Sequence, residues 1–426
     1  MDFSEHFLHF IWQFRLLNSA KLYCEDGEEL QVLHPGILNK HAGPDFSGAK
    51  LVIDGLNWVG DVEIHLKSSD WLAHGHQHNP AYNSVVLHVV YQYDSPIYRT
   101  NGSLVPVLVL KNLFSDHLFA NYSELIATVN PFPCQKHIAD VDRIVVDAFL
   151  SRVMIERFEQ KSEEVFKKLS QNRGDWEQTF YYFLARNFGF KVNAVPFELL
   201  ADALPHHLFS KYKDNALQIA ALIFGQAGFL EQPFIEVYPR QLQKEYAFLR
   251  KKHSLTHIES ALWKFLRMRP QNFPTIRLAQ FAALILKSNH LFSKILKAGS
   301  VAEMQVLFSE LPVNEYWRTH YHFNKNTGKV IVQPGLQFVH NIIINTVCLF
   351  LFSYGKYTDQ PELVDRAIDF LERIPSESNA IVNQYVSAGV IADRAFTSQA
   401  LLQLNKFYCS QKKCLNCAIG IKILKK

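Results

Sequence analysis

The chain has 426 residues, of which 48% are hydrophobic and 20% are charged, and its formal net charge at pH 7 is +4. This length accommodates two or three domains, and this composition excludes an intrinsically disordered chain. The mild positive charge is compatible with a polyanionic partner such as DNA or RNA but does not require one. The 33 phenylalanines are expected to fill helical cores rather than to stack on bases.

The N-terminus and the cysteine content indicate a cytoplasmic protein. Residues 1–5 include two acids and no long apolar segment follows them, so we expect no secretory signal. The longest apolar stretch, at about 342–352, is interrupted by Asn345 and Thr346 and is shorter than the roughly 20 residues of a membrane span. Six cysteines in so long a chain do not form a disulfide scaffold, which fits a reducing compartment.

Residues 1–112 are predicted to form a helix followed by about five strands. The apolar residues of 3–23 recur at helical spacing, which predicts one amphipathic helix. Asp54-Gly55 and Asn101-Gly102 are turn signals between strand-like runs, so we expect a β-hairpin around each of them. The predicted strands lie at 30–33, at about 46–67 as the first hairpin, and at 84–93 and 104–110 as the second.

From about residue 113 the pattern changes to helical periodicity. Roughly ten helices are expected between 113 and 404, separated by short breaks rich in Gly, Pro or Asn. No fixed repeat period is visible, so a solenoid is not expected. The sequence therefore predicts an α+β protein with three parts: a small helix-plus-sheet domain at 1–112, an all-α domain at 113–404, and a basic, Cys-rich tail at 405–426.

The segment of the first hairpin carries a row of ionisable groups. Asp61, Glu63, His65 and Lys67 alternate with three apolar residues, so in a strand they share one face. Such a row is costly unless the groups are solvated, paired or bound to a metal. Asp45 lies just before the preceding strand, and a hairpin at 46–67 would bring it towards Glu63.

An acid before one strand, and an acid two residues from a base on the next, is typical of metal-dependent nucleases. Asp45 and Glu63 would hold Mg²⁺ or Mn²⁺ through oxygen atoms, and His65 would orient the attacking water. Pro44-Asp45 and Glu63-Ile64-His65 resemble the motif of the PD-(D/E)xK nuclease superfamily. The resemblance implies a restriction-endonuclease-like domain, a hydrolase acting on nucleic acid, and an acid such as Glu5 on the preceding helix. His65 stands where that family has lysine, and Lys67 on the same face could substitute.

Two other interpretations of this stretch stay open. The row could be a solvated strand face with alternating charge. Alternatively, His65 together with His74, His76 or His88 could form a transition-metal site on a β-sandwich or cupin-like domain. A histidine in an exposed loop is usually only a surface residue, and His88, inside an apolar strand, is more often a core histidine than a ligand.

The C-terminal tail combines six lysines with the pattern Cys409-x4-Cys414-x2-Cys417. Two cysteines separated by two residues can both reach one tetrahedral ion, which predicts a zinc site or, with the same ligands, an iron–sulfur cluster. A fourth ligand could come from Cys134 or from a distant histidine. Ordinary reduced thiols are the alternative.

A further basic segment surrounds two prolines of the helical region. Arg267, Arg269 and Arg277 are candidates for binding nucleic-acid phosphates, because Arg presents a fork of donors. The alternative is a corner between helices whose arginines pair with acids. A non-catalytic adaptor that binds nucleic acid or a protein, with a zinc-stapled tail, is therefore a second functional hypothesis.

Four segments distributed along the chain carry a second resemblance. They are GPDF at 43–46, GDVEIHLKSSDW at 60–71, RPQNFP at 269–274 and CSQKKCLNC at 409–417. Together they resemble an uncharacterised bacterial family of unknown function over essentially the whole chain. This resemblance implies no activity, but it implies that the four segments belong to one protein type.

Overall fold

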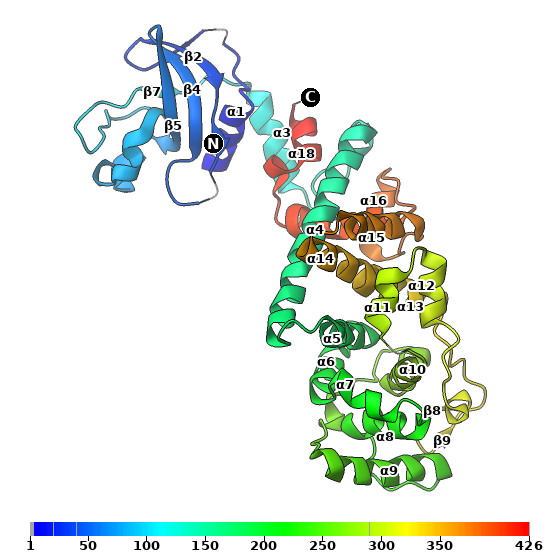
Figure 1. The fold of residues 1–426 in the computed structure, drawn as a ribbon. Helices are drawn as coiled ribbons and strands as arrows, with labels where there is room; N and C mark the ends of the chain where they lie inside the picture. Colours follow the sequence, from blue (N-terminus) through cyan, green and yellow to red (C-terminus); the bar gives the residue numbers. More distant parts are fainter. Residues whose placement is uncertain (1–3, 20, 40, 289, 426) are drawn as a thin grey trace. The chain divides into compact units, whose positions relative to one another are not determined.

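A computed structural model describes residues 4–19, 21–39, 41–288 and 290–425 of the chain (Figure 1). The chain divides into two compact units, of which the first comprises Met1–Phe149 and Asn405–Lys426 and the second comprises Leu150–Leu404. The first unit is thus larger than the predicted domain at 1–112. It takes in the tail because the C-terminal helix α18 (Ala418–Leu424) packs against α3 (Asp116–Ala127).

The N-terminal helix is shorter than predicted. Helix α1 runs over Glu5–Gln13, whereas periodicity predicted a helix at 3–23, of which residues 3 and 20 lie outside the described part of the chain. The helix ends because Arg15 adopts a left-handed conformation with φ 50° and the Leu16 N–H donates to the Ile11 carbonyl at 3.0 Å. The predicted helix was therefore wrong beyond its first three turns.

The first unit contains a mixed sheet whose strands follow the order β1-β2-β4-β5-β6-β7, with β3 paired to β4. Strands β4 and β5 are antiparallel, which confirms the hairpin predicted at 46–67, whereas β5–β6 and β6–β7 are parallel. All described strands of this unit belong to one sheet, whereas a β-sandwich has two. The strands are β1 (Leu22–Tyr23), β2 (Glu29–His34), β3 (Ile37–Leu38), β4 (Phe46–Ile53), β5 (Leu56–Lys67), β6 (Val85–Gln92) and β7 (Val107–Val109).

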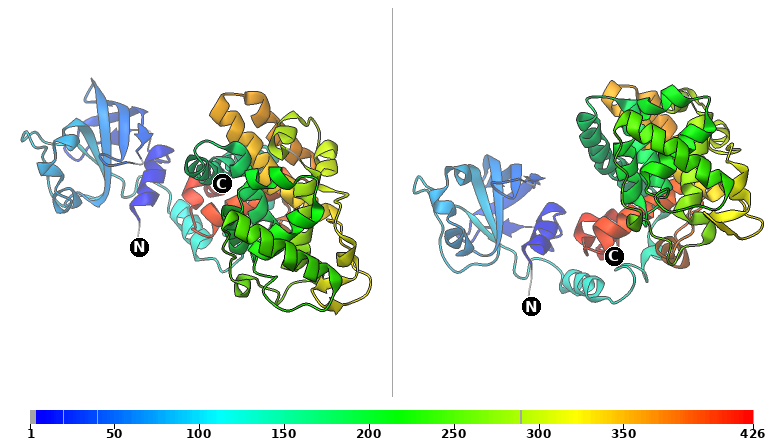
Figure 2. Two further views of the ribbon diagram at one scale, coloured as in Figure 1. Left: turned by 60° about the horizontal axis from the view of Figure 1, so that its bottom comes forward. Right: turned by 90° about the horizontal axis from the view of Figure 1, so that it is seen from below.

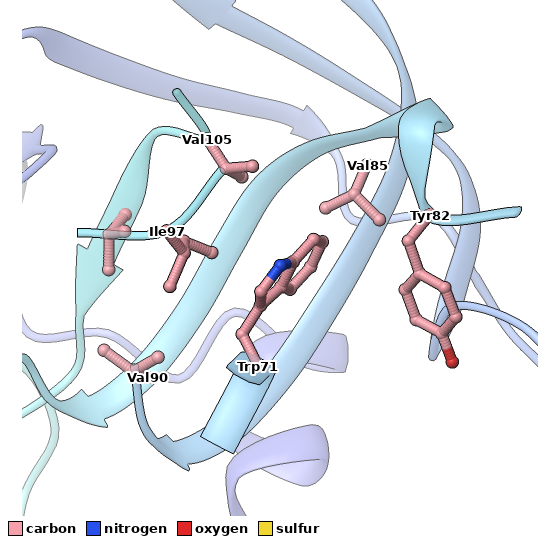
Figure 3. Close-up of a cluster of buried hydrophobic side chains, with 7 residues drawn as sticks. Trp71, Tyr82, Val85, Val90, Ile97 and Val105 are labelled. Atoms are coloured by element: carbon pink, nitrogen blue, oxygen red, sulfur yellow. The ribbon is translucent and has the colours of Figure 1, made fainter. Parts of the chain in front are cut away.

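A short crossover joins the parallel strands β5 and β6. It contains helix α2 (Asp70–Ala73) and two 3₁₀ turns, η1 (His76–His78) and η2 (Pro80–Ser84). Trp71 fastens this crossover, since its fully buried ring packs among apolar side chains and its indole N–H donates to the Tyr98 carbonyl at 3.2 Å (Figure 3). The crossover is therefore held over one face of the sheet.

The second predicted hairpin is wrong. The Asn101-Gly102 turn closes only an isolated bridge between Tyr98 and Leu104, and the chain then runs on to place β7 parallel to β6. Packing explains this path, because Ile97 and Val105 enter the buried cluster around Trp71 (Figure 3). The turn chemistry was identified correctly, but burial of its two flanks decided which strands pair.

The second unit is helical, as predicted, apart from the short strands β8 (His320–His322) and β9 (Lys325–Asn326). Consecutive helices pack against one another, as α5 does with α6, α8 with α9 and α14 with α15 (Figure 2). The long helix α4 (Arg143–Gln171) contains the boundary between the units. The other helices are α5 (Trp176–Phe188), α6 (Ala194–Ala203), α7 (His206–Phe209), α8 (Ala216–Gln226), α9 (Val237–His253), α10 (Pro274–Lys287), α11 (Leu291–Lys297), α12 (Val301–Phe308), α13 (Leu336–Ile342), α14 (Cys348–Thr358), α15 (Pro361–Arg373), α16 (Ala380–Ser387) and α17 (Ala395–Leu404).

One helical stretch of this unit, Leu336–Thr358, is by length and composition apolar enough to cross a membrane. It comprises α13, a π-helical turn at Ile343–Val347, and α14. This helix is longer than the interrupted apolar run that the sequence shows at about 342–352. Of its most apolar window, 72% is buried inside the unit, as in the central helix of a soluble domain, so the stretch is weak support for a membrane span.

Candidate metal centre

Pairing of β4 with β5 brings two carboxylates together. Phe46 lies opposite Val62, so Asp45 and Glu63 are the next neighbours across the strand pair. The Asp45 N–H donates to Glu63 Oε2 at 3.0 Å, and the Ile64 N–H donates to Asp45 Oδ2 at 2.9 Å. Each carboxylate is thus positioned by the backbone of the opposite strand, which confirms the predicted approach of Asp45 to Glu63.

A bulge in β4 turns the Asp45 end of the strand. The pairing register shifts between Phe46 and Ala49, and Gly48 in the bulge has φ +68°, a conformation that glycine adopts without strain. The Gly48 N–H donates to Asp61 Oδ1 at 3.2 Å, while the Ser84 hydroxyl donates to Asp61 Oδ2 at 2.6 Å. Asp61 therefore holds local structure together, and the bulge leaves Asp45 facing Glu63.

Two imidazoles contact the carboxylate of Glu63, and two more contact the ring of His65. His76 Nε2 lies 3.2 Å and His65 Nε2 lies 3.5 Å from Glu63 Oε1. The ring of His65 is held at both ends, by His74 Nδ1 at 3.0 Å from its Nε2 and by His88 Nε2 at 2.8 Å from its Nδ1. The ligand atoms of His65, His74 and His76 all lie within 4.8 Å of one another, a spacing that suits a shared metal ion.

The parallel connection explains how these imidazoles meet. In the parallel register of β5 and β6, Glu63 lies opposite His88. The crossover passes over the face of the sheet that carries His65 and His88, and it supplies His74 and His76. The His76 ring stacks on Tyr82 with 3.7 Å between centroids. Histidines from three successive segments, which are β5, the crossover and β6, therefore lie close together.

Helix α1 contributes two more groups to the centre. His9 Nε2 lies 3.2 Å from Asp45 Oδ2, and the Glu5 carboxyl interacts electrostatically with Asp45, His74 and His9. The acid that the nuclease resemblance implies on a preceding helix is therefore beside the centre. His9 was missed from the sequence, although its spacing of four residues from Glu5 places both on one face of a helix.

Most side chains of the centre are buried, and two of them are accessible to solvent. Glu63, His65, His76 and His88 are all less than 9% exposed, whereas His74 is exposed and the Asp45 side chain is 26% exposed. Burial, reinforced by the charge of Asp45, raises the pKa of Glu63 to about 8. Burial, reinforced by the neighbouring imidazoles, lowers the pKa of His65 and of His76 to about 4.

These groups fit a divalent cation. Neutral imidazoles are the form that ligates metals, and a nearby cation favours the ionised form of a carboxyl that burial would otherwise keep protonated. Within the described chain, His9 Nε2, His76 Nε2 and His88 Nδ1 are buried nitrogen atoms without a hydrogen bond, although the first two lie beside carboxylate oxygens. Unsatisfied buried nitrogens of this kind are costly unless something else occupies them.

Lys67 lies apart from this group. It is exposed at the end of β5, and its ammonium interacts electrostatically with Asp94. The structure thus brings together three of the four predicted site residues of the hairpin, Asp45, Glu63 and His65. A hollow of about 550 Å³ on the same unit, lined by residues such as Trp12 and Gln31, includes none of the three.

The three arginines predicted to bind phosphates do not share one environment. Arg267 and Arg269 are exposed, whereas Arg277 is buried and stacks on the Phe338 ring at 3.7 Å from its centroid. The Arg277 guanidinium donates to Asn272 Oδ1 at 2.6 Å and to Gln280 Oε1 at 2.7 Å. Arg277 therefore secures the start of α10, with amide and aromatic partners in place of the expected acids.

No curated protein and no solved structure matches this chain. A family model described as "Protein of unknown function (DUF2851)" matches residues 5–380. The match covers nearly the whole chain, includes the centre on β4 and β5, and ends before the tail cysteines. The expected membership of an uncharacterised family is thereby confirmed: the chain belongs to the DUF2851 family, whose function is unknown.

Proposed function

We propose that this protein is a metal-dependent phosphodiesterase that cleaves DNA or RNA. The observation that carries the proposal is the reciprocal approach of Asp45 and Glu63, 18 residues apart in sequence, with His65 beside them. A helix bearing Glu5 precedes the strands, in the order that the PD-(D/E)xK resemblance implies. The strand topology supports a restriction-endonuclease-like core, because an antiparallel pair carries both acids and a parallel strand follows.

Asp45 and Glu63 would hold the ion, together with the imidazole of His74 or His76. A mixed carboxylate and imidazole set suits Mn²⁺ better than Mg²⁺, which prefers oxygen ligands alone. When bound, a divalent ion lowers the pKa of water and offsets the charge on a phosphate. Glu5 and His9 complete the polar surround through their contacts with Asp45.

In phosphodiester hydrolysis a water attacks phosphorus, the P–O bond to the leaving group breaks, and the leaving oxygen takes up a proton. His65 is placed to orient that water, because the contact of its Nδ1 with His88 Nε2 at 2.8 Å fixes the ring and aims Nε2 towards Glu63. His65 would then perform the task assigned to lysine in the resembling family. The exposed face at His74 and Asp45 leaves an approach for the nucleic-acid backbone.

The proposal is tested by incubating the full chain with single- and double-stranded DNA and RNA, with Mn²⁺, with Mg²⁺ or with a chelator. We expect cleavage that requires the metal, is abolished by Asp45→Asn or Glu63→Gln, and falls about 100-fold in His65→Ala. Asp54→Asn is the matched control. It makes the same change in the turn of the same hairpin, where φ is 48° and asparagine is well tolerated.

Two results would overturn this function. One is cleavage that Asp45→Asn leaves unchanged, because the activity would then come from elsewhere or from a contaminant. The other is the absence of cleavage with every nucleic acid and metal. If salt-sensitive binding then remained and survived Glu63→Gln, the adaptor hypothesis would replace the nuclease.

The close spacing of His65, His74 and His76 favours a second candidate, a transition-metal enzyme that does not act on nucleic acid. Imidazole suits iron, nickel, copper and zinc, and three such ligands leave coordination positions for a substrate. Elemental analysis separates the two candidates. Iron, nickel or copper that co-purifies with the chain, is lost in His74→Ala, and accompanies no nuclease activity would support the second candidate.

A further inference from the structure

Four cysteines of the first unit converge from two distant parts of the chain. Cys409, Cys414 and Cys417 belong to the C-terminal tail, and the thiol of Cys134 interacts electrostatically with all three. Cys134, Cys414 and Cys417 are each at most 7% exposed. A sequence pattern with three candidate ligands thus acquires a fourth cysteine from the segment that follows α3.

Two tight turns and one helix arrange these thiols. Cys134 opens a turn in which its carbonyl accepts from the His137 N–H at 3.0 Å, and Cys414 opens another, in which its carbonyl accepts from the Cys417 N–H at 3.3 Å. Helix α18 begins directly after Cys417 and packs on α3. The segment after Cys134 faces this helix, since His137 and Ile423 line the same hollow.

Two backbone donors face the sulfur of Cys417, whereas burial raises the pKa of its thiol to about 12. The backbone N–H groups of Ile419 and Gly420 donate hydrogen bonds to its sulfur. Donors aimed at a sulfur stabilise negative charge on it, and the thiolate is the form that binds metal. Gly420 makes this turn possible, because a Cβ there would lie 2.4 Å from the Cys414 carbonyl oxygen.

The alternative to a metal site is a group of buried, reduced thiols, since cysteine is often buried. Cys24 and Cys348 are examples of this kind. Both are less than 5% exposed, and the charged neighbours of Cys24 are Glu28 and Asp26 rather than other thiols. The mutual interaction of four thiols is what distinguishes the cluster of the tail.

We propose that Cys134, Cys409, Cys414 and Cys417 form a structural zinc site that fastens the C-terminal segment to the first unit. Four thiolates complete a tetrahedral shell and leave no open position, so the site is structural rather than catalytic. Binding releases the thiol protons to solvent. Among the described groups, only the imidazoles of β5 and the crossover already lie at mutual ligand spacing, so the thiols must close further onto the ion.

The test measures metal in the full chain purified under reducing conditions and dialysed against a weak chelator. We expect one equivalent of zinc in the unmodified chain and in Cys24→Ser, and its loss in Cys134→Ser. Glu63→Gln should keep this equivalent, because the proposed nuclease centre uses other ligands. The zinc site and the proposed function can therefore fail separately.

Replacement of zinc by Co²⁺ in the unmodified chain gives a second measurement, which does not depend on a variant that could fail to fold. We expect the thiolate-to-cobalt charge-transfer absorption and the visible spectrum of tetrahedral cobalt. A chain free of zinc and without this absorption would overturn the proposal, as would zinc retained by Cys134→Ser. The visible spectrum of an iron–sulfur cluster in the purified chain would overturn the assignment to zinc.

Discussion

Burial without a strong ion partner shifts the pKa of several side chains of this protein. Glu63 and His65 are examples at the candidate centre, and Lys161 on α4 is an example inside the helical unit. The half-buried Lys161 donates to Asn345 Oδ1 at 3.2 Å. Loss of hydration, together with the nearby charge of Arg157, lowers the pKa of Lys161 to about 7.

Lys161 is expected to make stability depend on pH. Its pKa is lower in the folded than in the unfolded chain, so between about pH 7 and pH 10 the unfolded chain binds more protons. Its contribution to the free energy of unfolding therefore rises with pH, by up to about 1.4 kcal/mol per unit. Lys161→Met removes this term, so its stability relative to the unmodified chain should be highest near pH 7 and fall towards pH 10.

Urea unfolding at pH 7 and pH 9.5 measures this difference. The lost hydrogen bond to Asn345 adds an offset that is the same at both pH values, so it cancels in the comparison. A stability difference between the two chains that stays constant from pH 7 to pH 9.5 would contradict the lowered pKa.

At the scale of elements, two segments differ in how far along the sequence their contacts reach. The hairpin β4–β5 is largely local, whereas α18 packs on α3, and the segment before it donates a hydrogen bond from Lys412 Nζ to the Ile126 carbonyl at 2.5 Å. A short helix of seven residues is not stable by itself in water. The C-terminal segment is therefore expected to depend on its anchor points.

Chelation is expected to loosen the C-terminal segment without unfolding the helical unit. A chelator, or Cys414→Ser, should expose a protease site near residue 405 while leaving 150–404 resistant, because the proposed zinc ligands all belong to the first unit. Cys348→Ser, at a buried position of the helical unit, is the control and should not create this site. Equal cutting near 405 with and without chelator would argue against the anchor.

At the scale of the whole molecule, the candidate centre and the exposed arginines belong to different units. All residues of the acid and imidazole centre belong to the first unit, and the DUF2851 match extends over residues of both. The exposed Arg267 and Arg269 belong to the second unit and remain candidates for nucleic-acid contacts. Ligand effects on stability should therefore be local to one unit.

Mn²⁺ is expected to slow hydrogen exchange in the first unit and not in the second. A ligand that binds only the folded state adds about 2.7 kcal/mol at 100 times its dissociation constant. Protection should rise at β4, β5 and the crossover through residue 78, and the rise should be absent in Glu63→Gln. Mass spectrometry of deuterated peptides measures both units in one experiment, so equal protection everywhere or none would count against the centre.

The hairpin and its acids could be predicted from sequence because their geometry is local. Alternation with a period of two and the Asp54-Gly55 turn set the register, and the register places Asp45 beside Glu63. The change from strand to helical periodicity near residue 113 likewise predicted an α+β chain. The His74 and His76 loop and the Cys-x2-Cys half-site were visible as residue types at suitable spacing.

Only the tertiary structure decided which distant groups join these local ones. His9 reaches Asp45 from a helix, β7 runs parallel to β6, Cys134 meets the tail and Arg277 is buried. Each of these outcomes depends on which apolar faces pack against one another. The packing energy summed over the whole unit decides this, and no single segment determines it. Sequence by itself determined the nearest-neighbour geometry, because short loops permit few paths; long-range pairing has no comparable local signal.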